Sequence, residues 1–72
     1  MIVYAPFTSE QVESLNAYQS SGAFHPYTCD CGRVLRAVPA GLECPWCRRV
    51  QAWAHEFTVN GEWRGAGEER ML

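Results

Sequence analysis

The stretch TCDCGRVLRAVPAGLECPWC, from Thr28 to Cys47, decides the fold. It holds all four cysteines of the 72-residue chain, as one Cys-x-Cys pair and one Cys-Pro-x-Cys pair. Structural zinc is typically bound by two cysteine pairs that lie on tight turns and are brought together by a hairpin. The interval between the pairs suits one such hairpin. We therefore predict one metal ion, Zn2+, held by Cys29, Cys31, Cys44 and Cys47.

Disulfides and redox chemistry are the other uses of four thiols. The N-terminal residues show no basic segment or apolar run of a secretory signal, which predicts a cytoplasmic protein whose thiols stay reduced. The CPWC stretch also matches the Cys-x-x-Cys of thioredoxin-like enzymes, but those enzymes need a βαβ fold. A chain of 72 residues has no room for that fold. Both uses therefore remain minor alternatives to zinc.

Two histidines could replace a cysteine in the metal site. His25 lies four residues before Cys29, and His55 lies eight residues after Cys47. Cys31 is the ligand most open to replacement because its Cys-x-Cys spacing is tight. Four cysteines already complete a tetrahedral shell. We therefore expect each histidine to be an ordinary surface or partly buried residue.

The N-terminal part of the chain predicts an extended segment and a helix. Residues 1–7 form the extended lead. Residues 8–21 form the helix, which begins with a capping box of Thr8 and Gln11 and ends at a left-handed Gly22. Its apolar stripe is thin, so the helix must pack on the rest of the chain to be stable.

The remainder of the chain predicts a small zinc ribbon. Residues 25–57 contain the cysteines and read as a β-hairpin followed by a third strand. Residues 54–65 fit either a short helix or a second hairpin at their Asn-Gly pair. Residues 65–72 read as a flexible tail. The whole sequence, residues 1–72, therefore predicts a single α+β domain: a zinc ribbon with a packed N-terminal helix.

The charge balance argues against nucleic acid as the partner. The chain has six basic residues, all arginine, against eight acidic ones, giving a formal charge of −2. Four thiolates that bind one Zn2+ would take this charge to about −4. Nucleic-acid-binding domains usually show a clear basic excess because phosphate contacts dominate their affinity. A nucleic-acid-binding ribbon is thus the second hypothesis, supported only by the local cluster of Arg33, Arg36, Arg48 and Arg49.

A protein partner is the leading hypothesis. Trp46 stands at the tip of the second cysteine turn, where burial is difficult. If exposed beside Arg48 and Arg49, it would be a good anchor for another protein. The alternative is that Trp46 folds back over the N-terminal helix.

Catalysis and membrane insertion are not expected. The sequence offers no nucleophile with a base, no paired catalytic carboxylates and no phosphate-binding glycine loop. Four cysteine ligands leave zinc no open coordination position for chemistry. The longest apolar run is too short to span a membrane.

The segments YAPFTSEQVESLNAYQSSGAFHPYTC, LECPWC and WAH resemble small zinc-ribbon proteins encoded by tailed bacteriophages. The resemblance covers Tyr4 to about Phe57. It implies a phage product in the cytoplasm of a bacterial host, with a host or phage protein as partner, and it brings no established activity. Similar proteins often carry a longer loop with a histidine at the place of Cys31. The resemblance therefore implies that Cys29, Cys44 and Cys47 are the safest ligands.

Overall fold

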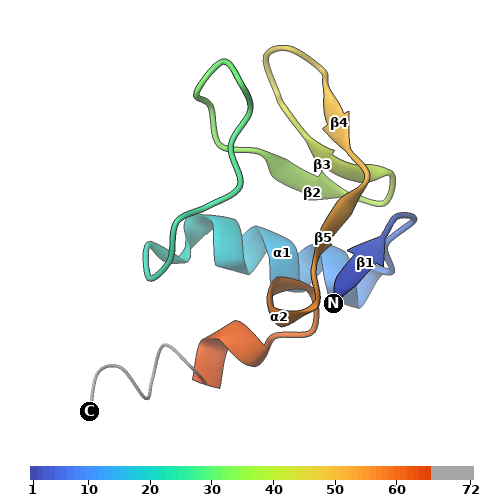
Figure 1. Cartoon of the computed structure of the whole chain (residues 1–72), viewed down its shortest axis with the longest axis vertical. Helices are drawn as coiled ribbons and strands as arrows, with labels where there is room; N and C mark the ends of the chain where they lie inside the picture. Colours follow the sequence, from blue (N-terminus) through green and yellow to red (C-terminus); the bar gives the residue numbers. More distant parts are fainter. Residues whose placement is uncertain (66–72) are drawn as a thin grey trace.

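The computed structural model describes residues 1–65, in which helices pack against two small antiparallel sheets (Figure 1). One sheet has the strand order β2-β3-β4, and the other pairs β1 with β5. The α+β class predicted from the sequence is confirmed. The elements in chain order are β1 (Ile2–Tyr4), α1 (Ser9–Ser21), β2 (Arg36–Val38), β3 (Gly41–Glu43), β4 (Val50–Gln51), β5 (Trp53–His55) and α2 (Glu56–Val59).

Helix α1 begins and ends where its sequence predicts. The Thr8 hydroxyl accepts from the Gln11 N–H at 3.2 Å, and the Gln11 side chain accepts from the Thr8 N–H at 2.8 Å. This reciprocal pair is the expected capping box. At the other end Gly22 has a φ of 74°, a left-handed conformation that side chains with a β-carbon disfavour.

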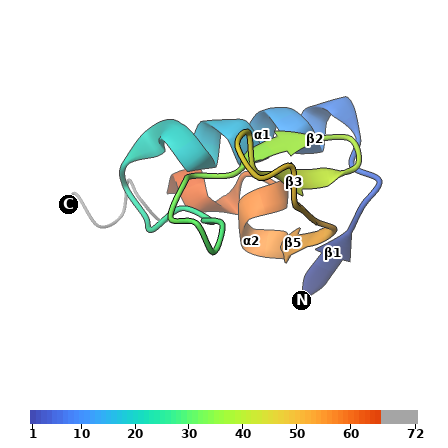
Figure 2. The same ribbon diagram turned by 90° about the horizontal axis from the view of Figure 1, so that it is seen from above.

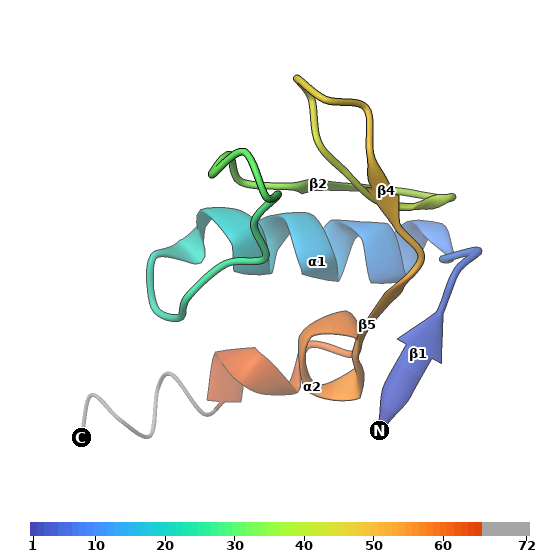
Figure 3. The same cartoon turned by 45° about the horizontal axis from the view of Figure 1, so that its top comes forward.

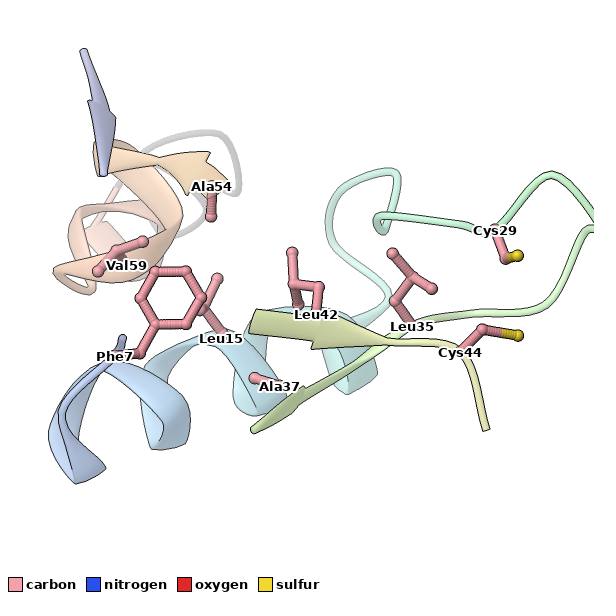
Figure 4. Close-up of a cluster of buried hydrophobic side chains, with 9 residues drawn as sticks. All are labelled: Phe7, Leu15, Cys29, Leu35, Ala37, Leu42, Cys44, Ala54 and Val59. Carbon is pink, nitrogen blue, oxygen red and sulfur yellow. The ribbon is translucent and has the colours of Figure 1, made fainter. Parts of the chain in front are cut away.

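The core lies on two sides of α1. Figure 3 shows α1 between the β2–β3 hairpin on one side and α2 with β5 on the other, and Figure 2 shows the same hairpin lying along the helix. Leu15 of α1 and Leu42 of β3 are fully buried. Figure 4 shows the cluster around them, which continues to the cysteines at one end. Its members are Phe7, Leu15, Cys29, Leu35, Ala37, Leu42, Cys44, Ala54 and Val59.

Two amide side chains fasten α1 to the ribbon. Asn16 donates to the carbonyl of Ala37 at 3.1 Å and accepts from its N–H at 2.8 Å. Gln19 donates to the carbonyls of Tyr27 and Leu35 at 2.8 and 2.7 Å, and it accepts from the Tyr27 N–H at 2.8 Å. Asn16 thereby covers the free edge of β2. The thin apolar stripe of α1 is thus supplemented by hydrogen bonds, which apolar periodicity does not reveal.

Of the two alternatives for residues 54–65, the structure shows the short helix. Strand β5 pairs with β1 in the register Ile2↔His55, Val3↔Ala54 and Tyr4↔Trp53. Helix α2 follows at once, and residues 62–65 are helical again. The hairpin alternative is wrong, because β5 takes its partner from the N-terminus and the Asn-Gly pair joins two helical segments.

The tail expected over residues 65–72 lies outside the described residues after its first position. Among residues 1–65, no helix combines the length and the apolar character needed to cross a membrane.

Candidate metal centre

The structure brings the four cysteine sulfurs together. The Sγ atoms of Cys29, Cys31, Cys44 and Cys47 all lie within 4.8 Å of one another, and none forms a disulfide. The Sγ atoms of Cys31 and Cys44 are 3.7 Å apart. A tetrahedral ion with sulfur ligands at about 2.3 Å has sulfur–sulfur edges of about 3.8 Å. The four cysteines are therefore positioned to bind one metal ion.

The first cysteine turn is closed by its own backbone. The Gly32 N–H donates to the Cys29 carbonyl, and the Cys29 N–H donates to the Arg33 carbonyl, each at 2.8 Å. Gly32 adopts a φ of 91°, which lets the chain curl back under the sulfurs. The N–H of Arg33 then reaches the sulfur of Cys31, and this hydrogen bond is the main reason that the pKa of Cys31 falls to about 6.

The second cysteine turn repeats this construction. The Arg48 N–H donates to the Cys44 carbonyl at 3.0 Å, and the Cys44 N–H donates to the Arg49 carbonyl at 2.9 Å. The Cys47 N–H donates to the sulfur of Cys44 at 3.3 Å and lowers the pKa of that thiol. Amide donors to the sulfurs are thus present in both turns and would steady a thiolate site.

The thiols of the cluster differ in how readily they ionise. A hydrogen bond with Cys31 is the largest cause that raises the pKa of Cys47, to about 12. Because these thiols share hydrogen bonds, the cluster loses its first proton more readily than its last. Metal ligation requires thiolates, so metal binding releases protons and is favoured as the pH rises.

The histidines lie outside the cluster. His25 Nδ1 lies 2.8 Å from the Pro26 carbonyl oxygen. The ring of His55 stacks on Tyr27, with centroids 6.4 Å apart. Within the part of the chain that the structure describes, the metal-binding group consists of cysteines only. Cys31, the ligand considered most open to replacement, lies with the other three.

The sequence-predicted partner residues Trp46, Arg48 and Arg49 are exposed and lie on or directly after the second cysteine turn. Trp46 is 71% exposed, so it does not fold back over α1. The guanidinium of Arg33 lies 4.5 Å from its ring centroid, which links the two cysteine turns. Arg48 pairs with Glu43 at 3.1 Å, and Arg49 pairs with Asp30 at 2.9 Å.

Arg33 belongs to the predicted arginine cluster, but its contact with Trp46 was not predicted. This contact could have been predicted from the sequence, because Arg33 and Trp46 each belong to a cysteine turn and the metal site brings the two turns together. We call Arg33, Trp46, Arg48 and Arg49 the knuckle surface.

Arg48 occupies a backbone position that favours glycine. It follows the second cysteine of its turn, as Gly32 does in the other turn, and has a φ of 63°. A non-glycine residue there costs about 1 kcal/mol or more. Its exposed ion pair with Glu43 contributes little, about 0–1 kcal/mol.

We therefore expect Arg48→Gly to leave the free energy of unfolding unchanged or to raise it by up to about 1 kcal/mol. Arg49→Gly is the matched control, because Arg49 also loses one exposed ion pair but has no positive φ; it should be destabilising. Urea unfolding of the metal-loaded variants measures both. A larger loss for Arg48→Gly than for Arg49→Gly would contradict the expectation.

No family model, curated protein or solved structure matches the chain. The assignment of the metal centre therefore depends on the geometry of the four sulfurs and their amide donors. The resemblance to phage-encoded zinc-ribbon proteins stays a prediction.

Proposed function

We propose that the chain binds one structural Zn2+ and acts as a non-catalytic module that binds another protein through the knuckle surface. The observation that carries this proposal is the exposed indole of Trp46, with the guanidinium of Arg33 stacked on it at the rim of the metal centre.

Zinc is the metal that this donor set favours. Four thiolates in a tetrahedral arrangement are a usual shell for structural zinc. The N–H donors to Cys31 and Cys44 suit a centre with a net charge of −2. When bound, the ion would hold the two cysteine turns together. A shell of four sulfurs leaves no position for water or substrate, which supports a structural role.

The knuckle surface has the composition of a protein-binding site. Tryptophan and arginine are the residues most enriched among the anchors of protein interfaces. Trp46 sits on a turn whose backbone is fixed by hydrogen bonds at both ends, so little conformational freedom would be lost on binding. Stacking on the indole also holds Arg33 in place with the edge of its guanidinium available to a partner.

Nucleic acid fits the same surface less well. Arg48 and Arg49 are engaged by Glu43 and Asp30, and Arg36 lies 4.0 Å from Glu43. Considering carboxylates of residues 1–65, Arg33 is the ribbon arginine that has none within 4.0 Å. Binding to nucleic acid at physiological salt usually needs several phosphate contacts. A protein partner is therefore the better-supported choice.

Affinity purification from phage-infected bacterial cells tests the proposal, since the resemblance suggests a bacterial cytoplasm as the setting. A captured protein must then bind the purified zinc-loaded chain directly. We expect Trp46→Ala to weaken this binding at least about tenfold, because interface anchors contribute about 2 kcal/mol or more. Circular dichroism should show an unchanged fold, since the ring is 71% exposed.

Arg64→Ala is the control, an exposed arginine outside the ribbon that should leave binding intact. Equal binding by the wild type and by Trp46→Ala would count against the knuckle surface. A salt-sensitive shift of DNA or RNA that depends on the ribbon arginines would favour the nucleic-acid alternative instead.

A further inference from the structure

Among residues 1–65, strand β1 makes hydrogen bonds along one edge only. Two bonds bracket its pairing with β5: the Ala5 N–H donates to the Ala52 carbonyl, and the Glu56 N–H donates to the Met1 carbonyl, each at 2.9 Å. Hydrogen-bonded and non-hydrogen-bonded pairs alternate along an antiparallel ladder. Val3 is therefore the residue within β1 whose backbone groups face β5.

The backbone groups of Ile2 and Tyr4 consequently point the other way. Their N–H and C=O groups have no hydrogen-bond partner among residues 1–65. Figure 1 shows β1 beside β5 with its other edge facing outward. Such an edge is a template for a further strand.

The neighbouring strand edges are covered. On β5, the His55 N–H donates to the Tyr27 hydroxyl at 2.9 Å, and the Thr58 hydroxyl donates to the His55 carbonyl at 2.7 Å. The Gln51 side chain donates to the Trp53 carbonyl at 2.9 Å. The asparagine of α1 covers β2 as described above, and β4 is only two residues long. Within the described part of the chain, β1 thus has the longest strand edge left open.

The side chains around this edge favour strand pairing. The sequence Ile2-Val3-Tyr4 has high β-propensity, and the chain carries no charged side chain before Glu10. Tyr4 is 70% exposed, and its cross-strand neighbour Trp53 is 37% exposed. Charged side chains usually protect open edges, and here they are missing.

We propose that β1 pairs antiparallel with β1 of a second copy of this chain, about a two-fold axis through Val3. Ile2 then lies opposite Tyr4 of the second copy, and Tyr4 lies opposite Ile2 of the second copy. Each of these pairs exchanges two N–H···O bonds, so all four open groups of each strand are satisfied. No charged side chain lies on either edge, although each zinc-loaded chain would carry a formal charge of about −4.

The side chains of the two copies complement each other in this register. Ile2 and Tyr4 are on the same face of β1, because side chains alternate along a strand. Pairing therefore places the Tyr4 ring of one copy against Ile2 of the other and extends the Tyr4–Trp53 pair into one apolar face across four strands. Aromatic and β-branched pairs of this kind stabilise sheets.

The dimer is expected to be weak. A three-residue edge buries much less than the roughly 1,200–2,000 Å2 of stable interfaces, so the dissociation constant should be about 0.1–1 mM. The loops that carry the cysteines project from the top of Figure 1, well above β1. The dimer would thus leave both knuckle surfaces free, and binding to a repeated partner would gain from two linked sites.

Sedimentation equilibrium of the zinc-loaded full chain up to about 1 mM tests the inference. We expect a monomer–dimer equilibrium that Tyr4→Pro weakens at least tenfold, since proline removes an outward N–H and leaves the bonds to β5 intact. Tyr4→Val is the matched control: it also loses the ring but keeps the N–H, so it should dimerise more tightly than Tyr4→Pro. Isotope-filtered NMR of a mixed-label sample should show contacts between Ile2 of one copy and Tyr4 of the other.

A chain that stays monomeric at 1 mM would overturn the proposal. So would a dimer that Tyr4→Pro and Tyr4→Val affect equally, or one whose intermolecular contacts lie on another surface. These outcomes are independent of partner binding at the knuckle surface. The Tyr4 variants leave Trp46 unchanged, and Trp46→Ala leaves the β1 edge unchanged.

Discussion

Replacing Cys44 with serine is expected to leave the chain largely unfolded and without a bound metal. Cys44 is fully buried and belongs to both the sulfur cluster and the hydrophobic core. Its backbone also closes the second cysteine turn through hydrogen bonds with Arg48 and Arg49. Binding of structural zinc contributes on the order of 10 kcal/mol to folding, and this contribution depends on a complete set of ligands.

A loss of this size is comparable with the whole free energy of unfolding of a small domain. Native domains are stable by only about 5–15 kcal/mol, and a chain this short lies toward the lower end. Circular dichroism and metal analysis of purified Cys44→Ser measure the effect. Trp46→Ala is the control, because it lies on the same turn but contributes no ligand, and it should keep both the spectrum and the metal. A Cys44→Ser protein with a native spectrum and one metal per chain would contradict the account.

The second large effect is expected at Gln19. Gln19→Ala removes three hydrogen bonds that join α1 to the backbone of Tyr27 and Leu35. Each such bond contributes about 1 kcal/mol, and more when a buried partner is left unsatisfied. We expect the free energy of unfolding to fall by about 3 kcal/mol. Alanine is the better helix former, so a loss cannot come from helix propensity.

Urea unfolding at fixed excess zinc measures this change. Gln51→Ala is the matched control, since that glutamine makes one exposed hydrogen bond, to the Trp53 carbonyl. It should lose less than about 1 kcal/mol. If Gln19→Ala and Gln51→Ala have the same stability, the hydrogen bonds of Gln19 do not hold α1 and the role given to Gln19 is wrong.

Local patterns in the sequence predicted the parts of the fold that local chemistry controls. The spacing of the cysteines predicted the hairpin and the sulfur cluster. Thr8, Gln11 and Gly22 predicted both ends of α1, because helix caps depend on residues only a few positions apart. The positive φ of Arg48 was also within reach, since Gly32 occupies the same place in the other turn.

The long-range contacts could not be predicted in this way. The pairing of β1 with β5 joins segments about 50 residues apart in the sequence, and no periodicity specifies a partner at that distance. The same is true of Asn16 and Gln19, whose amides bond to backbone groups that carry no residue-specific signal. The Asn-Gly pair wrongly suggested a second hairpin for a related reason: the tertiary pairing of β5 with β1 overrode a local turn preference.

Metal content together with chelation tests the central claim most directly. Native mass spectrometry of the purified chain should show one zinc ion per chain, bound by the cluster of Cys29, Cys31, Cys44 and Cys47. Removing the ion with EDTA should abolish most of the circular dichroism signal, and adding one equivalent of Zn2+ should restore it. A chain that carries no stoichiometric metal, or that keeps its spectrum and melting temperature in EDTA, would contradict the account.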